Sequence, residues 1–109
     1  MTFDADSEYL VSNDVTLRDL RDYVGRYAPL YGFTRVFLFG SRARGDFTED
    51  SDYDFCVVPG EDCDLLSLGG FLEDMHDCLG KEISVVSKNG LKPYFFQSVE
   101  PDMRLLYEV

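Results

Sequence analysis

The sequence contains no tryptophan, a single histidine, and only 10 lysine and arginine residues against 21 aspartate and glutamate residues. The resulting formal charge of −11 disfavours direct binding of DNA or RNA, because affinity for nucleic acid comes mainly from cationic side chains that neutralise phosphates. Such an acidic surface suits simple solubility, a basic protein partner, or carboxylates that hold divalent cations. His76 has no second histidine to join it in a metal site, and we interpret it as a surface or boundary residue.

Three further absences bear on where the protein works. Cys56, Cys63 and Cys78 are odd in number and lack the C-x-x-C spacing of zinc and redox sites. No apolar run reaches the roughly 18 residues that a membrane-spanning helix needs. No basic region precedes an apolar run near residue 1, as it would in a secretory signal. We therefore expect a cytoplasmic protein with three reduced thiols and no contact with a membrane.

What is present is the composition of one globular domain. The chain has 109 residues, of which 45% are hydrophobic, and nine phenylalanines and seven tyrosines supply large apolar side chains. We expect a single domain over residues 1–109. The first 14 residues are mostly polar and are predicted to form a loose N-terminal arm.

Helical and strand patterns alternate along the chain, which predicts an α/β fold. Thr16 and Asp19 resemble a helix capping box, and apolar residues then recur at helical spacing until Pro29 and Gly32. A second helical pattern contains Gly69-Gly70, each costing about 1 kcal/mol relative to alanine. The aromatic run Tyr94–Phe96 fits either core packing or contact with a partner. The expected elements are helices at 17–27, 65–79 and 93–99 and strands at 34–39, 54–58, 82–86 and 105–107.

The segment Gly40–Asp54, GSRARGDFTEDSDYD, carries the chemistry. A strand that runs into Gly40-Ser41 lets the backbone approach a ligand closely, and successive N–H groups in such a turn can cradle phosphate oxygens together with the serine hydroxyl. Arg42 and Arg44 can neutralise phosphate charge. Asp52 and Asp54 are two residues apart at the start of a strand, so both carboxylates point to one side and can hold Mg²⁺.

Each part of this segment has another interpretation. The spacing Gly40-x-x-x-x-Gly45 is superficially that of a P-loop, but Asp46-Phe47 stands where the lysine and serine or threonine should be, which excludes a Walker site. An isolated Asp-x-Asp is most often a turn. The combination of Gly-Ser, a ten-residue spacer and Asp-x-Asp is far more specific than either part.

This combination closely resembles the signature of minimal nucleotidyltransferases of the DNA polymerase β superfamily. The resemblance extends from about Leu17 to Tyr107, because Lys81–Val86, Gly90–Pro93 and Leu105–Tyr107 resemble the third strand, short helix and closing strand of that family. It implies a nucleotidyltransferase fold, in which a small mixed sheet has helices packed mainly on one side.

The resemblance also implies an activity: transfer of a nucleoside monophosphate, AMP from ATP being the expected case, to a hydroxyl with release of pyrophosphate. By this resemblance Gly40 and Ser41 bind the triphosphate, and Arg44 braces the loop or the phosphates. Arg42 is assigned to nucleotide binding from its charge alone. Asp52 and Asp54 are the catalytic and metal-binding residues, with one or two Mg²⁺ ions. Stand-alone members often act as the antitoxin of a helical HEPN-family toxin, and the acidic charge of this chain is compatible with such a partner. The sequence also leaves a homo-oligomer open.

The sequence departs from the family at one position. Ser84 stands where many active members carry a third carboxylate, and Glu82, two residues earlier on the same strand face, is the candidate substitute. Three hypotheses follow: a working Mg²⁺-dependent nucleotidyltransferase, a catalytically degenerate binding module that masks a protein partner, and an oligomeric nucleotide sensor without chemistry.

Overall fold

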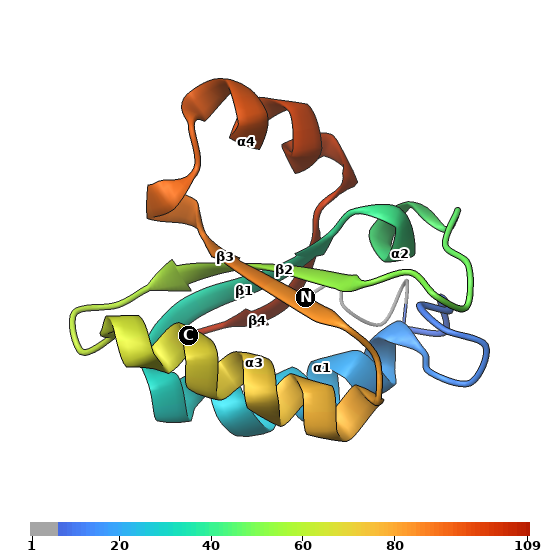
Figure 1. The fold of residues 1–109 in the computed structure, drawn as a ribbon, viewed down its shortest axis with the longest axis horizontal. Coiled ribbons are helices and arrows are strands. Elements are labelled where there is room, and N and C mark those ends of the chain that lie inside the picture. The colour runs from blue at the N-terminus through green and yellow to red at the C-terminus, as the bar shows by residue number, and fades with distance from the viewer. Residues whose placement is uncertain (1–6) are drawn as a thin grey trace.

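The computed structural model describes residues 7–109, except for the side chain of Leu65. Helices α1 and α3 cover one face of a four-stranded sheet, and α4 lies on the opposite side of that sheet (Figure 1). The elements in chain order are α1 (Leu17–Tyr27), η2 (Ala28–Tyr31), β1 (Phe33–Phe39), α2 (Ser41–Arg44), β2 (Tyr53–Pro59), α3 (Leu65–Leu79), β3 (Ile83–Ser87), η3 (Lys88–Gly90), α4 (Pro93–Val99), η4 (Glu100–Asp102) and β4 (Arg104–Glu108).

The strands lie in the order β3-β2-β1-β4. The central strand β1 pairs antiparallel with both β2 and β4, whereas β2 and β3 are parallel. Because parallel neighbours need a crossover, the chain returns from β2 to β3 through α3. This arrangement confirms the expected small mixed sheet with helices mainly on one side.

Local capping fixes where α1 begins. The backbone N–H of Asp19 donates to Thr16 Oγ1 at 3.2 Å, and the backbone N–H of Thr16 donates to Asp19 Oδ2 at 3.0 Å. This reciprocal pair is the predicted capping box, and it satisfies donors that have no partner within the helix. Leu17, Leu20 and Val24 then turn one buried face of α1 toward the sheet.

Aromatic rings fill the space between the sheet and α3. The Phe71 ring centroid lies 5.2 Å from that of Phe33 and 5.7 Å from that of Phe55, in edge-to-face contacts that the aromatic quadrupole favours. Gly70 has a packing role here, since a Cβ at this position would lie 2.6 Å from the Tyr31 ring. The glycine that weakens α3 as a helix therefore allows its close contact with η2.

The N-terminal segment differs from the prediction of a loose arm. Residues 1–6 lie outside the described part of the chain, but residues 7–14 pack on the domain: Val11 is fully buried, Leu10 forms a bridge with Thr16, and the Leu17 N–H donates to the Tyr9 carbonyl at 2.7 Å. The polar composition predicted a loose arm, whereas the apolar contacts of Val11 and Tyr9 with the core and the main-chain hydrogen bonds hold residues 7–14 in place.

Helix α4 is largely exposed to solvent. None of its residues is buried, and the Tyr94 and Phe95 side chains are 72% and 40% exposed. Of the two interpretations of this aromatic run, core packing is therefore not the one that the structure adopts. Within residues 7–109, no helix combines the length and apolar character needed to cross a membrane.

Candidate active site

The candidate site begins where β1 ends. The chain turns at Gly40 with φ 76° and ψ −160°, a backbone conformation that is open in practice only to glycine, and α2 starts at the next residue. The N–H groups of Ala43 and Arg44 both donate to the Gly40 carbonyl at 3.1 Å, which closes the short helix. The first N–H groups of α2, at Ser41 and Arg42, have no acceptor within a helix and are the ones expected to meet a phosphate.

Asp54 lies directly against this turn. It pairs with Phe39 across β1 and β2, and a Cβ built at Gly40 would collide with its carboxylate, with Asp54 Cγ only 3.1 Å away. Glycine is thus required at residue 40 both by its positive φ and by the closeness of Asp54. The structure brings together the two halves of the predicted motif, which are 14 positions apart in the sequence.

The electrostatics of this corner favour a cation. Burial raises the pKa of the Asp54 carboxyl above its ordinary value, the Asp52 carboxylate raises it further, and the Arg44 guanidinium acts in the opposite direction. Asp52 is exposed and lies immediately before β2, two residues ahead of Asp54, a spacing that puts side chains on one side of an extended chain. The two hard oxygen donors suit Mg²⁺, and a bound divalent cation would remove the repulsion between them.

The position at which many family members carry a third carboxylate lies on β3, at Ser84. Ser84 pairs with Asp54 in the parallel register of β2 and β3, so a serine lies beside the catalytic candidate. Glu82 is exposed and precedes β3, and its carbonyl accepts the Tyr53 N–H at 3.0 Å. Among residues 7–109, no three His, Cys, Asp or Glu side chains converge as a metal-binding group, so Glu82 does not join the aspartate pair in this conformation.

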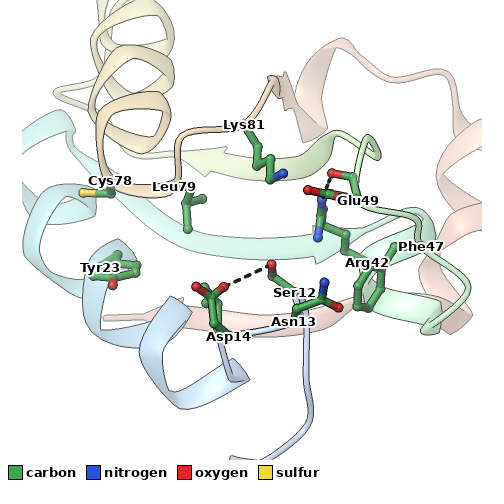
Figure 2. A pocket seen from close by; sticks show the side chains of 11 residues that line it. Ser12, Asn13, Asp14, Tyr23, Arg42, Phe47, Glu49, Cys78, Leu79 and Lys81 are labelled. Atoms are coloured by element: carbon green, nitrogen blue, oxygen red, sulfur yellow. Dashed lines mark hydrogen bonds between the residues drawn. The ribbon is translucent and has the colours of Figure 1, made fainter.

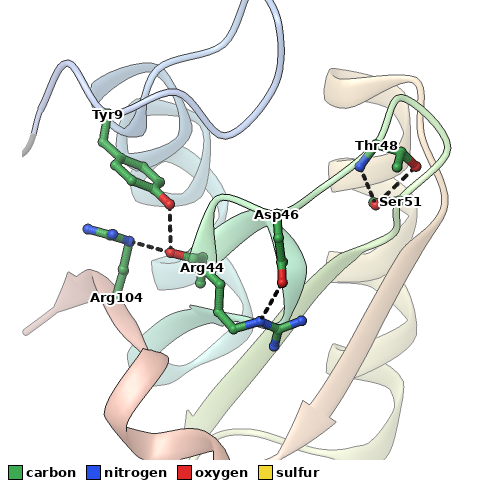
Figure 3. A network of polar contacts seen from close by, with 7 residues as sticks. Tyr9, Arg44, Asp46, Thr48, Ser51 and Arg104 are labelled. Carbon is green, nitrogen blue, oxygen red and sulfur yellow. Dashed lines mark hydrogen bonds and ion pairs between the residues drawn. The ribbon is translucent and has the colours of Figure 1, made fainter.

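The two arginines of the motif have different surroundings. Arg44 is exposed, and its Nε lies 3.3 Å from Asp46 Oδ2 in a surface ion pair (Figure 3). Its guanidinium can exchange this weak contact for a phosphate at little cost.

Arg42 is only 1% exposed, and its guanidinium donates to main-chain carbonyls, including those of Val11 at 2.6 Å and Ser51 at 2.8 Å. We therefore leave Arg42 out of the proposed phosphate contacts, although the sequence placed it there. A buried and an exposed arginine are indistinguishable from the local sequence alone.

Sequence reasoning missed two further residues at α2. The Tyr9 hydroxyl and Arg104 Nε both donate to the Ala43 carbonyl, at 2.9 and 2.8 Å (Figure 3). The Arg104 guanidinium carbon lies 3.6 Å from the Tyr9 ring centroid, so the two side chains also stack on each other. Their partner is 34 and 61 residues away in the sequence, a separation at which no local pattern signals a contact.

A polar cavity of about 490 Å³ lies behind the loop, on the side of α1 and α3 (Figure 2). Side chains from the N-terminal turn, α1, the loop and the end of α3 line it, among them Asp14, Tyr23, Glu49 and Lys81. Neither Asp52 nor Asp54 contributes to this lining, so the cavity is separate from the carboxylate corner.

Comparison with known proteins gives consistent matches. Residues 32–109 match the family described as Polymerase beta, Nucleotidyltransferase. Two proteins of Methanocaldococcus jannaschii, provisionally named protein adenylyltransferases, are similar in sequence. One is 38% identical over 63 residues, covering 58% of this chain and 68% of that protein. The other is 30% identical over 93 residues, covering 81% and 95%.

Solved structures give the same picture. A structure provisionally described as a minimal nucleotidyltransferase matches with a TM-score of 0.73 and 31% identity, over 85% of this chain and 98% of that one. A toxin–antitoxin complex with AMP-PNP contains a chain that matches with a TM-score of 0.70 and 16% identity, over 82% and 73%. The complex of a tri-AMPylated Shewanella oneidensis HEPN toxin with an MNT antitoxin gives a TM-score of 0.65 and 14% identity, over 86% and 74%.

At 14–16% identity, the two toxin–antitoxin structures show a shared fold and no more. The family match goes further, because residues 32–109 include the Gly-Ser turn and the Asp-x-Asp segment whose geometry is described above. On these grounds, the chain belongs to the polymerase β nucleotidyltransferase family.

Proposed function

We propose that this protein transfers AMP from ATP to a hydroxyl group on another protein, with Mg²⁺ and with release of pyrophosphate. The observation that carries the proposal is the contact of Asp54 with the Gly40-Ser41 turn. That contact joins a phosphate cradle to a pair of carboxylates at one corner of the sheet, which is what nucleotidyl transfer requires.

In this proposal each residue has a defined role. The turn at Gly40 and the Ser41 hydroxyl hold the triphosphate, and Arg44 supplies positive charge to it. Asp52 and Asp54 hold the metal. When bound, Mg²⁺ would supply charge neutralisation for the phosphate oxygens and for the departing pyrophosphate.

The bond changes of the reaction are simple. The acceptor oxygen forms a bond to the α-phosphorus, the bond between that phosphorus and the oxygen bridging to the β-phosphate breaks, and pyrophosphate leaves with the electron pair. The hydroxyl proton passes to a base. Glu82 is our candidate for that base, because its carbonyl accepts the N–H of Tyr53, the residue between the two aspartates.

The choice of AMP and of a protein acceptor rests on the relatives and on charge. Both related proteins of M. jannaschii carry the name of protein adenylyltransferases. The formal charge of −11 disfavours an RNA acceptor, because the chain would repel the acceptor's phosphates.

We further propose that the acceptor is a HEPN-family toxin, for which this protein acts as antitoxin. The support is the fold shared with an antitoxin that was solved with a tri-AMPylated HEPN toxin. An acidic surface would also complement a basic partner.

The test is transfer of label from α-³²P-ATP in the presence of Mg²⁺ and a co-expressed HEPN protein. We expect label on the partner, and we expect it to disappear in the Asp52→Asn/Asp54→Asn double variant. The matched control is Glu61→Gln/Asp62→Asn, which removes two negative charges from exposed neighbouring residues outside the site. Undiminished transfer by the aspartate double variant would refute the assignment of these residues.

One observation favours a second candidate function. Because Ser84 lies beside Asp54, the chain can be a catalytically degenerate domain that masks a toxin by binding alone. In that case the protein would form a stable complex and suppress toxicity, while no label would reach the partner. Suppression that survives the aspartate double variant would select this alternative.

A further inference from the structure

The loop that links the two halves of the site has little structure of its own. Residues 45–52 contain neither a helix nor a strand. Within the loop, the Thr48 N–H donates to Ser51 Oγ at 2.9 Å and the Ser51 N–H donates to the Thr48 carbonyl at 3.1 Å. These exposed bonds form one small turn, which cannot by itself fix Asp52 and Asp54 relative to Ser41.

The Arg42 side chain supplies the missing support from inside. Its Nε and Nη2 both donate to the Ser51 carbonyl, at 3.1 and 2.8 Å, one residue before Asp52. Its Nη2 also approaches the carbonyls of Thr48 at 3.5 Å and Glu49 at 3.4 Å. A planar guanidinium can collect several carbonyls in this way, whereas a lysine ammonium cannot reproduce the same fork.

Two aromatic rings pack against the Arg42 guanidinium. Its central carbon lies 4.3 Å from the Tyr53 ring centroid and 5.0 Å from that of Phe47. Tyr53 is buried and lies between Asp52 and Asp54 in the chain, so the ring that contacts Arg42 belongs to the strand that carries the carboxylates. Arg42 therefore joins α2, the loop and the start of β2.

The N-terminal segment completes this support. Arg42 Nη1 donates to the Val11 carbonyl at 2.6 Å, and the Tyr9 hydroxyl donates to the Ala43 carbonyl of α2 at 2.9 Å. Val11 is held in turn by a hydrogen bond from its N–H to the Val15 carbonyl at 2.9 Å. Tyr9 and Val11 lie outside residues 32–109, the part of the chain that matches the family.

We propose that Arg42 and Tyr9 are positioning residues for nucleotidyl transfer: together with the Val11 carbonyl, they hold the triphosphate turn and the two aspartates at a fixed distance. This inference rests on the proposed function. It adds that the N-terminal segment is a working part of the active site and that Arg42 contacts no phosphate.

Two variants test the positioning, with a third as matched control. Arg42→Lys keeps the charge and loses the fork, and Tyr9→Phe keeps the ring and loses only the hydroxyl. Tyr31→Phe also loses one tyrosine hydrogen bond, the one to Asp74. Tyr31 belongs to η2, which precedes the start of β1, whereas Gly40 follows the end of that strand. All three proteins are first shown to be folded by circular dichroism at the assay temperature, so that a loss of folded protein does not count as a loss of rate.

The decisive readout is how kcat and KM for ATP change. Misplaced carboxylates lower the rate of the chemical step, so we expect kcat to fall about 10- to 100-fold in Arg42→Lys and Tyr9→Phe, with a small change in KM. Tyr31→Phe should keep both values. A rise in KM with unchanged kcat in Arg42→Lys would overturn the proposal, because it would identify Arg42 as a phosphate-binding residue. Wild-type kinetics in both test variants would overturn it too.

Amide hydrogen exchange separates this inference from the proposed function. We expect the amides of Ala43, Arg44 and Gly45 to exchange about 3- to 10-fold faster in Tyr9→Phe, and the Ser51 amide to do so in Arg42→Lys, since each variant loses hydrogen-bond support. Unchanged exchange in both would refute the positioning role. If the wild type transfers no AMP, the proposed function fails, and exchange alone then decides whether these residues fix the loop.

Discussion

Replacing Gly40 by alanine is the sharpest test of the site geometry. The backbone at this residue has φ 76° and ψ −160°, and the new Cβ would collide with the Asp54 carboxylate. The strained backbone costs about 1–3 kcal/mol. Moving Asp54 off its preferred rotamer adds about 0.5–1.5 kcal/mol, so we expect a total near 2–4 kcal/mol. For a domain of this size, that loss lowers Tm by roughly 10–20 °C.

Thermal melts followed by circular dichroism measure this loss, with Gly25→Ala as control. Gly25 lies in α1, and no atom lies within 4 Å of a Cβ added there. The Gly25→Ala protein should therefore be more stable than the wild type by about 0.5–1 kcal/mol. Combining Gly40→Ala with Asp54→Ala removes the carboxylate and should recover about 1 kcal/mol, leaving the backbone strain. A Gly40→Ala protein that melts no lower than wild type would refute the geometry on which the candidate site depends.

Four further predictions concern other parts of the domain. In α3, Gly69→Ala should raise the free energy of unfolding by about 0.5–1 kcal/mol, because no atom lies near the added Cβ. Gly70→Ala should lower it by about 1–3 kcal/mol, because the added Cβ would collide with the Tyr31 ring. Denaturant melts of the two variants measure both changes. Burial raises the pKa of the Cys56 thiol to about 11, so a thiol-reactive dye at pH 8 should label the two half-buried cysteines first and Cys56 only on unfolding; fast labelling of three thiols would contradict this. Hydrogen bonding to a carboxylate in α3 raises the pKa of Tyr31 to about 12. Because this pKa is higher in the folded than in the unfolded protein, protonated Tyr31 stabilises the fold fully below the ordinary value of 10.0, and this contribution is lost as the pH rises toward 12. Tyr31→Phe should therefore flatten the fall in stability at alkaline pH, which thermal melts over that pH range measure. Finally, Ser84→Asp places a third carboxylate beside the aspartate pair and should increase labelled-AMP transfer at least several-fold if that position limits the rate, and equal transfer would show that it does not.

Local patterns in the sequence predicted the elements well. The capping box at Thr16 and Asp19, the apolar spacing of α1 and the breaks at Gly32 and Gly80 are all encoded within a few residues of where they act. The same holds for the Gly-Ser turn and for the Asp-x-Asp strand. Their contact followed from the family resemblance, since no local rule states which strand end meets which turn.

What escaped prediction depends on distant contacts. Arg42 looks like Arg44 in sequence, and only its burial between Phe47 and Tyr53 gives it another role. The contact of Tyr9 with α2 spans 34 residues. Polarity suggested a loose arm for residues 7–14, because composition does not reveal which main-chain groups find partners in the folded domain.

The two hydrogen bonds to the Ala43 carbonyl bear on the order in which the protein folds during synthesis. This carbonyl accepts hydrogen bonds from residues near both ends of the sequence, Tyr9 and Arg104. During synthesis the turn and both aspartates leave the ribosome well before Arg104 does, since domains emerge from their N-terminus onward. The nascent chain therefore carries every residue of the candidate motif while the Ala43 carbonyl of α2 still lacks its hydrogen bond from Arg104. We therefore expect the nucleotide site to become fully supported only when β4 docks, after the whole motif has already been synthesised.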